Sequence, residues 1–211
     1  MSIDFDPVVI AKSFALIFPV ELPDKTFIAT LVLATRFRPL YAWIGVSLAF
    51  LVQCIVAVAA GSLLNLLPHW IVALVSAALF SIGAVILLLH VRKARQEESA
   101  TEHEFEEKVA KHAHDSGLRS IGFSFLVLFA AEWGDLSQLL TANLVARYKE
   151  PWSVFLGSWL ALLVVSGLAV LLGRTLLRWI DIMWLKLAGA LVCAIFAVIS
   201  LVEVARTSGL L

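Results

Sequence analysis

The chain has 211 residues, of which 61% are hydrophobic and only 15% are charged. This composition lies outside the range of soluble domains and predicts an all-α integral membrane protein that contacts lipid. Sixteen basic residues balance sixteen acidic residues, so the net charge attracts the chain neither to nucleic acid nor to an anionic surface. Nucleic acid is therefore not expected as a partner.

Apolar runs long enough to cross a bilayer, about 20 residues each, predict six transmembrane helices. They lie at residues 8–35, 40–64, 70–91, 120–146, 152–173 and 183–204. We expect the first run to be retained rather than cleaved as a signal peptide, because Asp4 and Asp6 precede it and no basic stretch does. Cys54 and Cys193 lie inside predicted spans and are interpreted as packing residues.

The basic residues predict the orientation of these spans. With the N-terminus outside, eleven lysines and arginines face the cytoplasm, whereas the reverse orientation places only Lys12, Arg147, Lys149 and Arg206 there. Short cytoplasmic loops carry the excess of basic residues in membrane proteins. We therefore expect a multi-pass protein with both termini outside and the charged loop 92–119 in the cytoplasm. In a bacterial host this membrane would be the plasma membrane.

One segment of the chain occurs twice. SFALIFPVELPDKTFIATLVLATRFR from Ser13 recurs as SFLVLFAAEWGDLSQLLTANLVARYK from Ser124, with a constant offset of 111 residues that aligns the acids of both copies. Each copy contains three predicted spans, so the second copy must cross the membrane in the opposite sense. The sequence thus predicts an inverted repeat of two three-helix halves, 1–91 and 120–211, joined by the linker 92–119.

Inverted repeats are typical of secondary transporters, in which interrupted helices of the two halves face each other near the membrane midplane. Pro19 and Pro23 are expected to interrupt the first helix, and Gly134 is the weak point of its counterpart. The two acidic motifs are predicted to meet across a pseudo-two-fold axis. Because the acids of each motif are three residues apart, we also expect each pair to project from one helix face.

Acids are expensive in this environment. A charged carboxylate near the bilayer centre costs about 2.5 to 3.5 kcal/mol, so four cost roughly 10 kcal/mol or more. Structural ion pairing explains them poorly, since Lys25 can neutralise Glu21 at i,i+4 but leaves three acids without an evident partner. A functional role is therefore favoured over a structural one.

The side chains around the acids predict which ion they bind. Both motifs offer oxygen ligands, in Thr26, Ser137 and Gln138, and neither contains Cys, His or Met. Such ligands suit Mn²⁺, Ca²⁺ or Mg²⁺ rather than Cu, Ni or Zn. The hydroxyls have an alternative interpretation, in which they bond to carbonyls of their own helix.

Buried carboxyl groups also attract protons, because desolvation and mutual repulsion disfavour their charged forms. A divalent cation and about two protons would then compete for one site, as a cation/proton exchanger requires. Two other functions stay open, a passive cation channel and an amino-acid exporter whose acids bind the substrate amine. An enzyme is not expected, since no nucleophile or HExxH motif occurs.

With ELPDKT at 21–26 and EWGDLS at 132–137, the chain resembles the Gdt-type family of cation/proton exchangers, whose hallmark is a doubled E-x-G-D-[KR]-[ST] motif. The resemblance covers both repeats and the central linker. It implies export of Mn²⁺ foremost, or of Ca²⁺, in exchange for protons, with no cofactor beyond the transported ion. The implied ligands are Glu21, Asp24, Glu132 and Asp135, supported or gated by Thr26, Ser137, Gln138 and Lys25.

Two residues depart from the family motif. Pro23 replaces a glycine and is expected to stiffen the first break, and Leu136 replaces a basic residue, which leaves Lys25 alone. Lys25 either pairs with Glu21 in the empty site or fills the site as an internal cation, and a salt bridge without a transport role is the alternative. The sequence leaves open the selectivity between Mn²⁺ and Ca²⁺, the proton stoichiometry and whether the chain forms a homo-oligomer.

Two further features are weighed against simpler explanations. The linker carries His103, His112 and His114 among seven acids, which is interpreted as a solvated helix or disordered linker, with metal sensing as the alternative. Arg36 and Arg147 stand at matched helix ends and are interpreted as anchors at the membrane surface, with gating as the alternative.

Overall fold

The computed structural model of the chain describes residues 5–22, 24–64, 68–91, 94–110, 117–179 and 182–207. Within these ranges all regular secondary structure is α-helical. The helices formed by the described residues are α1 Pro7–Glu21, α2 Lys25–Arg36, α3 Pro39–Leu64, α4 His69–Val91, α5 Ala94–Ala110, α6 Leu118–Ala131, α7 Leu136–Tyr148, α8 Pro151–Trp179 and α9 Ile182–Thr207.

Four of these helices, α3, α4, α8 and α9, are long and apolar enough to cross a bilayer. Together α6 and α7 form a fifth candidate when counted as one span, which is bent by 75° between them. Large apolar side chains remain exposed on these helices, for example Leu63 at 67% and Leu171 at 79%. Water would penalise such a surface and lipid would not. The predicted all-α membrane protein is therefore supported, with four to five candidate spans in the described residues.

The first predicted span is divided into α1 and α2, which have 15 and 12 residues. Asp6 begins α1, because its Oδ1 accepts hydrogen bonds from the backbone N–H groups of Val8 and Val9 at 2.8 and 3.4 Å. Pro19 lies inside α1, so the helix continues past it to Glu21. The expected interruption at Pro19 is wrong, and Pro23 lies outside the described residues.

The two halves of the chain pack into each other at matched positions. Gly45 of α3 lies against α6, where an added Cβ would lie 2.8 Å from Ser124 Cβ. Gly157 of α8 lies against α1, where an added Cβ would lie 2.8 Å from Ser13 Cβ. Gly45 corresponds to Gly157 in the repeat, and Ser13 to Ser124. The two contacts are thus reciprocal, which is the relation that a two-fold axis produces.

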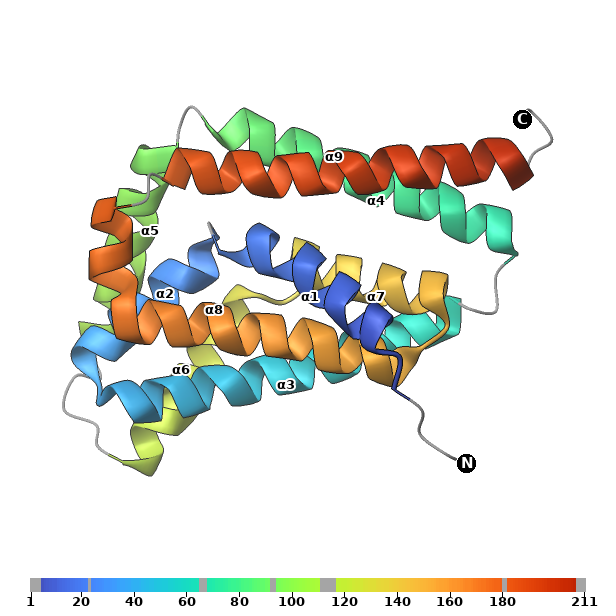
Figure 1. The fold of residues 1–211 in the computed structure, drawn as a ribbon. Helices are drawn as coiled ribbons and strands as arrows, with labels where there is room; N and C mark the ends of the chain where they lie inside the picture. Colours follow the sequence, from blue (N-terminus) through green and yellow to red (C-terminus); the bar gives the residue numbers. More distant parts are fainter. Residues whose placement is uncertain are drawn as a thin grey trace.

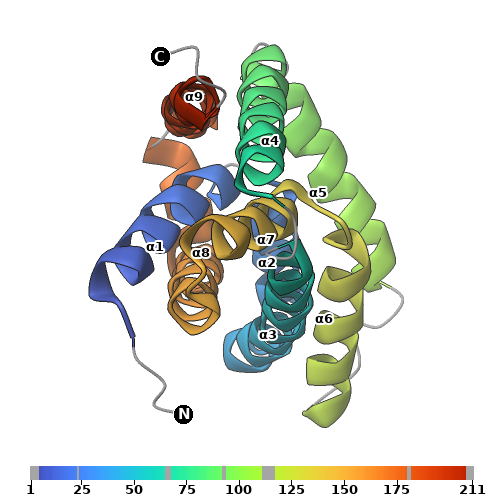
Figure 2. The same ribbon diagram turned by 90° about the vertical axis from the view of Figure 1, so that its right-hand side faces the viewer.

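Neighbouring helices in this bundle come mostly from different halves of the chain. Close packing joins α1 with α8, α3 with α6, and α4 with α9; Figure 2 shows α4 and α9 standing side by side above the other helices. The α1–α8 and α3–α6 pairs lie around buried side chains such as Leu16, Phe50 and Leu128. One core is therefore shared by both halves.

The ends of the bundle differ. The beginning of α1 and the end of α9 lie at one end, and α5 lies at the other (Figure 1). This arrangement agrees with the prediction that both termini lie on the side opposite the charged linker.

The linker contains a helix with one buried face. Phe105 and Val109 of α5 are exposed by only 3% and 0%, and Glu106 Oε1 lies 3.6 Å from Arg36 Nη2 of α2. The described linker residues thus form a docked helix rather than the solvated helix or disordered segment expected, and His103 is exposed on it. Two further linker histidines lie outside the described residues: His112 and His114.

Candidate cation site

Each broken span places its two acids on either side of an interruption. Glu21 is the last residue of α1, and Asp24 is the N-cap of α2. In the second copy Glu132 is the C-cap of α6, and Asp135 is the N-cap of α7. The prediction that each pair projects from one helix face is therefore wrong, because the helix ends between its two acids.

The two interruptions share one pattern of backbone hydrogen bonds. Asp24 N donates to Glu21 O at 3.1 Å, and Asp135 N donates to Glu132 O at 3.2 Å. Gly134 turns the second break with a φ of +76°, a conformation that side chains with a Cβ rarely adopt. The weak point predicted at Gly134 is thereby confirmed.

The structure brings the four predicted acids together, although the two motifs are 111 residues apart in sequence. Glu21, Asp24, Glu132 and Asp135 each offer a carboxylate oxygen within 4.8 Å of the others. Ca²⁺ binds oxygen at about 2.3 to 2.6 Å, and oxygens on opposite sides of such an ion lie about 5 Å apart. One divalent ion therefore fits among these carboxylates without rearrangement of the helices.

Burial makes this cluster unstable as a set of bare charges. The exposed fractions of Glu21 and Glu132 are 1% and 3%. Glu21 Oε2 and both carboxylate oxygens of Glu132 are enclosed and have no hydrogen-bond partner among the described residues. An enclosed carboxylate without a partner is costly, so the arrangement requires a proton or a cation.

Two features of the site compensate part of the negative charge. Both α2 and α7 begin at the cluster, so the partial positive charge of each helix N-terminus faces the acids. Lys25 Nζ lies 3.9 Å from Asp135 Oδ1, with the Lys25 side chain 40% exposed. The predicted i,i+4 pair between Lys25 and Glu21 is replaced by this contact between the halves, because the helix breaks between residues 21 and 25.

The hydroxyl of each motif faces the glutamate of the other motif. The buried Thr26 hydroxyl lies beside Glu132 without completing a hydrogen bond, and the Ser137 hydroxyl interacts with Glu21. Gln138 behaves differently, since its Oε1 accepts a hydrogen bond from Gly134 N at 2.9 Å. Thr26 and Ser137 are therefore placed to contact an ion with the acids, while the Gln138 carbonyl holds the second break.

Two residues outside the motifs contribute to the site. Gln53 of α3, considered from sequence only as packing or as reaching the site, donates from Nε2 to Phe129 O at 3.3 Å and so binds a backbone carbonyl near the end of α6. Lys186 of α9 is 8% exposed and interacts electrostatically with Asp24. Sequence reasoning used Lys186 only for orientation, although a lysine beside a predicted span was a usable signal.

Comparison with known families now decides the class of this molecule. A family model described as "Divalent cation/proton antiporter GDT1" matches residues 9–95 and again residues 120–208. The chain belongs to this GDT1 family. It is accordingly a member of a membrane antiporter family for divalent cations, and the family resemblance predicted from ELPDKT and EWGDLS is confirmed.

Individual relatives agree with the GDT1 assignment over most of their length. The chain is 30% identical to "GDT1-like protein sll0615" of Synechocystis sp. over 186 residues, which are 85% of this chain and 90% of the relative. It is 29% identical to "GDT1-like protein 5" of Arabidopsis thaliana over 214 residues, with 90% and 93% covered. It covers 58% of the longer "GDT1-like protein 2, chloroplastic" of Oryza sativa, at 27% identity. No solved structure matches the chain.

Proposed function

We propose that this chain is a secondary active transporter that exports a divalent cation, Mn²⁺ in preference to Ca²⁺, in exchange for protons. The observation that carries the proposal is the cluster of four carboxylates within 4.8 Å of one another, two of them enclosed, at the breaks of two helices. Family membership supports divalent cations and protons as the transported species. The cation is substrate here, and the mechanism requires no resident cofactor.

The architecture that we propose has six spans, in which α1 and α2 together form the first and α6 and α7 the fourth. The reciprocal Gly45–Ser124 and Gly157–Ser13 contacts support two inverted halves, 1–91 and 120–211, with 92–119 as their linker. The double match of the family model supports the same division. The distribution of basic residues favours both termini outside and the linker in the cytoplasm of a bacterial plasma membrane.

Charge balance in the site explains how protons drive the cation. Four carboxylates and the Lys25 ammonium sum to a formal charge of −3. A divalent cation or about two protons each reduce this charge to about −1, so exchanging one for the other keeps the buried charge constant. Glu21 and Glu132, whose oxygens lack partners, are the proposed proton acceptors. Rocking of the helices would open the site to each side in turn.

The test is flux of Mn²⁺ and of Ca²⁺ into proteoliposomes under an imposed pH gradient. We expect gradient-driven flux in the wild type and its loss in both Glu21→Gln and Asp135→Asn, because each variant removes one carboxylate from the cluster. Glu107→Gln is the matched control, since Glu107 lies exposed on α5.

Three results would contradict the proposal. Flux that survives both substitutions would make the paired motifs structural. Flux that ignores the pH gradient would indicate a channel. Competition by lysine or arginine but not by Mn²⁺ would indicate an amino-acid exporter.

A further inference from the structure

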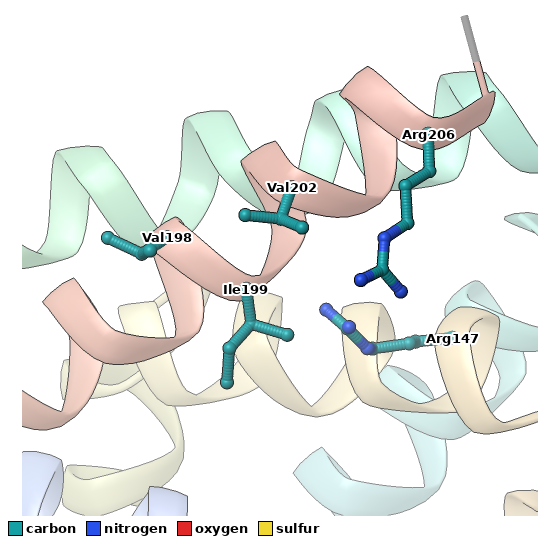
Figure 3. A pocket seen from close by; sticks show the side chains of 5 residues that line it. All are labelled: Arg147, Val198, Ile199, Val202 and Arg206. Carbon is teal, nitrogen blue, oxygen red and sulfur yellow. The ribbon is translucent and has the colours of Figure 1, made fainter. Parts of the chain in front are cut away.

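A second polar site lies away from the carboxylates, where α7 and α9 end. Arg147 is in the last turn of α7 and Arg206 is in the last turn of α9. They line an open cavity of about 400 Å³ together with Val198, Ile199 and Val202. Figure 3 shows the two guanidinium groups pointing toward one another from the two helices.

The charge of this cavity favours an anion. A guanidinium stays protonated at all physiological pH values, so both groups direct permanent positive charge into one space. Among the described residues the lining contains no acidic side chain. The Arg147 guanidinium is also fixed, because Nη1 donates a hydrogen bond to Ser200 Oγ at 2.7 Å and Ser200 is fully buried. Planar guanidinium groups held in this way match the oxygens of a phosphate.

The repeat shows that this placement is not a general property of the family fold. Arg36 is the counterpart of Arg147 at the matching helix end. Its guanidinium lies 3.6 Å from the Glu106 carboxylate of α5. Arg147 instead bonds to a neutral serine and faces a second arginine. The two ends of the bundle therefore use equivalent arginines for different purposes.

The remaining walls indicate what kind of phosphate binds. Val198, Ile199 and Val202 are exposed by 59%, 46% and 39% on α9. A small soluble anion gains nothing from these side chains, whereas an acyl chain covers them. Basic pockets between transmembrane helices bind lipid head groups in this manner. We propose that the Arg147–Arg206 cavity binds the phosphate of an anionic phospholipid, whose chain lies along α9. This inference does not depend on the proposed transport mechanism.

The experiment is native mass spectrometry of the full-length protein in micelles that contain equal amounts of phosphatidylglycerol and phosphatidylcholine with identical chains. We expect the wild type to retain phosphatidylglycerol preferentially. Each of Arg147→Gln and Arg206→Gln should weaken this binding about fivefold, and the double variant about 25-fold. Lys149→Gln removes the same charge two residues from Arg147 and outside the cavity, and should change binding less than twofold.

Further arms separate the alternatives. Arg147→Lys and Arg206→Lys keep the charge and should retain most of the preference, which guards against loss of folding as the cause. Displacement of the lipid by excess inorganic phosphate would identify a soluble anion as the ligand and overturn the proposal. An equal loss in Lys149→Gln would reduce the effect to general surface charge. Glu203 stands three residues before Arg206 in sequence; lipid preference that appears only in Glu203→Gln would show that this acid occupies the arginines.

Discussion

At the first break Asp24 Oδ1 accepts a hydrogen bond from Lys25 N at 2.7 Å, which caps α2. At the second break Asp135 makes no such bond, and its Oδ1 instead lies 3.9 Å from the ammonium group of Lys25. The backbone around both breaks is nevertheless the same, with one hydrogen bond from the aspartate back to the glutamate in each. The halves thus agree in geometry and differ in charge.

The aromatic packing before each break repeats this agreement. The rings of Phe14 and Phe18 stack at 5.5 Å with 10° between their planes, and those of Phe125 and Phe129 do the same. Packing and backbone are therefore symmetric around the site. The asymmetry is confined to charged groups, chiefly Lys25, and such an asymmetry lets a symmetric frame distinguish its two sides.

The largest expected effect tests the symmetric part. Glu21→Gln and Glu132→Gln should each reduce cation/proton exchange about 100-fold, since removing one partner from a buried charged cluster costs about 3 kcal/mol. Initial flux in proteoliposomes measures this. Both variants should remain folded, because glutamine is isosteric with glutamate. A large loss in one variant and normal flux in the other would show that the two motifs are not equivalent.

A second comparison concerns the helix crossings. Gly45→Ala and Gly157→Ala should each lower the free energy of unfolding by about 1 to 3 kcal/mol, because the new methyl group meets the neighbouring helix. Denaturant titration of the purified protein measures the change. Gly122→Ala is the control, since nothing lies within 4 Å of its Cβ position, and it should stabilise α6 by about 0.5 to 1 kcal/mol. A penalty at only one crossing would disprove the reciprocal packing.

The charge asymmetry is sharpened by exchanging residues 25 and 136. Lys25→Leu should raise the affinity for Mn²⁺ about fivefold, a modest change because the Lys25 side chain is 40% exposed and partly screened. Leu136→Lys should lower it by a similar factor. Calorimetric titration at constant pH measures both affinities. Lys25→Arg and Leu136→Met are the controls for charge and packing, and unchanged affinity in Lys25→Leu would remove the lysine from the site.

The smallest expected effect lies at the docked linker helix. Arg36 and Glu106 are exposed by 42% and 39%, and partly exposed ion pairs contribute about 0.2 to 1 kcal/mol. A double-mutant cycle with Arg36→Gln and Glu106→Gln should therefore give a coupling in that range. A coupling of several kcal/mol would mean that this ion pair, rather than burial of Phe105 and Val109, holds α5.

The acids of the site could be predicted from sequence because charge is rare in apolar spans and these four positions recur at one offset. The position of the break could not. Pro19 is tolerated inside α1, and the helix ends only after Glu21. Which atom receives the Lys25 ammonium depends on that break, since an unbroken helix would direct it to Glu21. No periodicity relates residue 25 to residue 135.

The docked face of the linker carried a signal that composition obscured. Phe105 and Val109 are four residues apart and share one side of a helix that is otherwise strongly charged. Two apolar residues among many acids are weak evidence in sequence. They become informative only when α2 supplies the surface that buries them.

The close crossings at Gly45 and Gly157 determine what can move as a unit. Each crossing seats a helix of one repeat directly on the backbone of the other, so neither sequence half encloses its own core. Expressed alone, either half would expose the surfaces that its partner covers and would not be an independent folding unit. Any change that opens the site must therefore carry α1 with α8 and α3 with α6, and its hinges lie between these mixed pairs rather than at the linker.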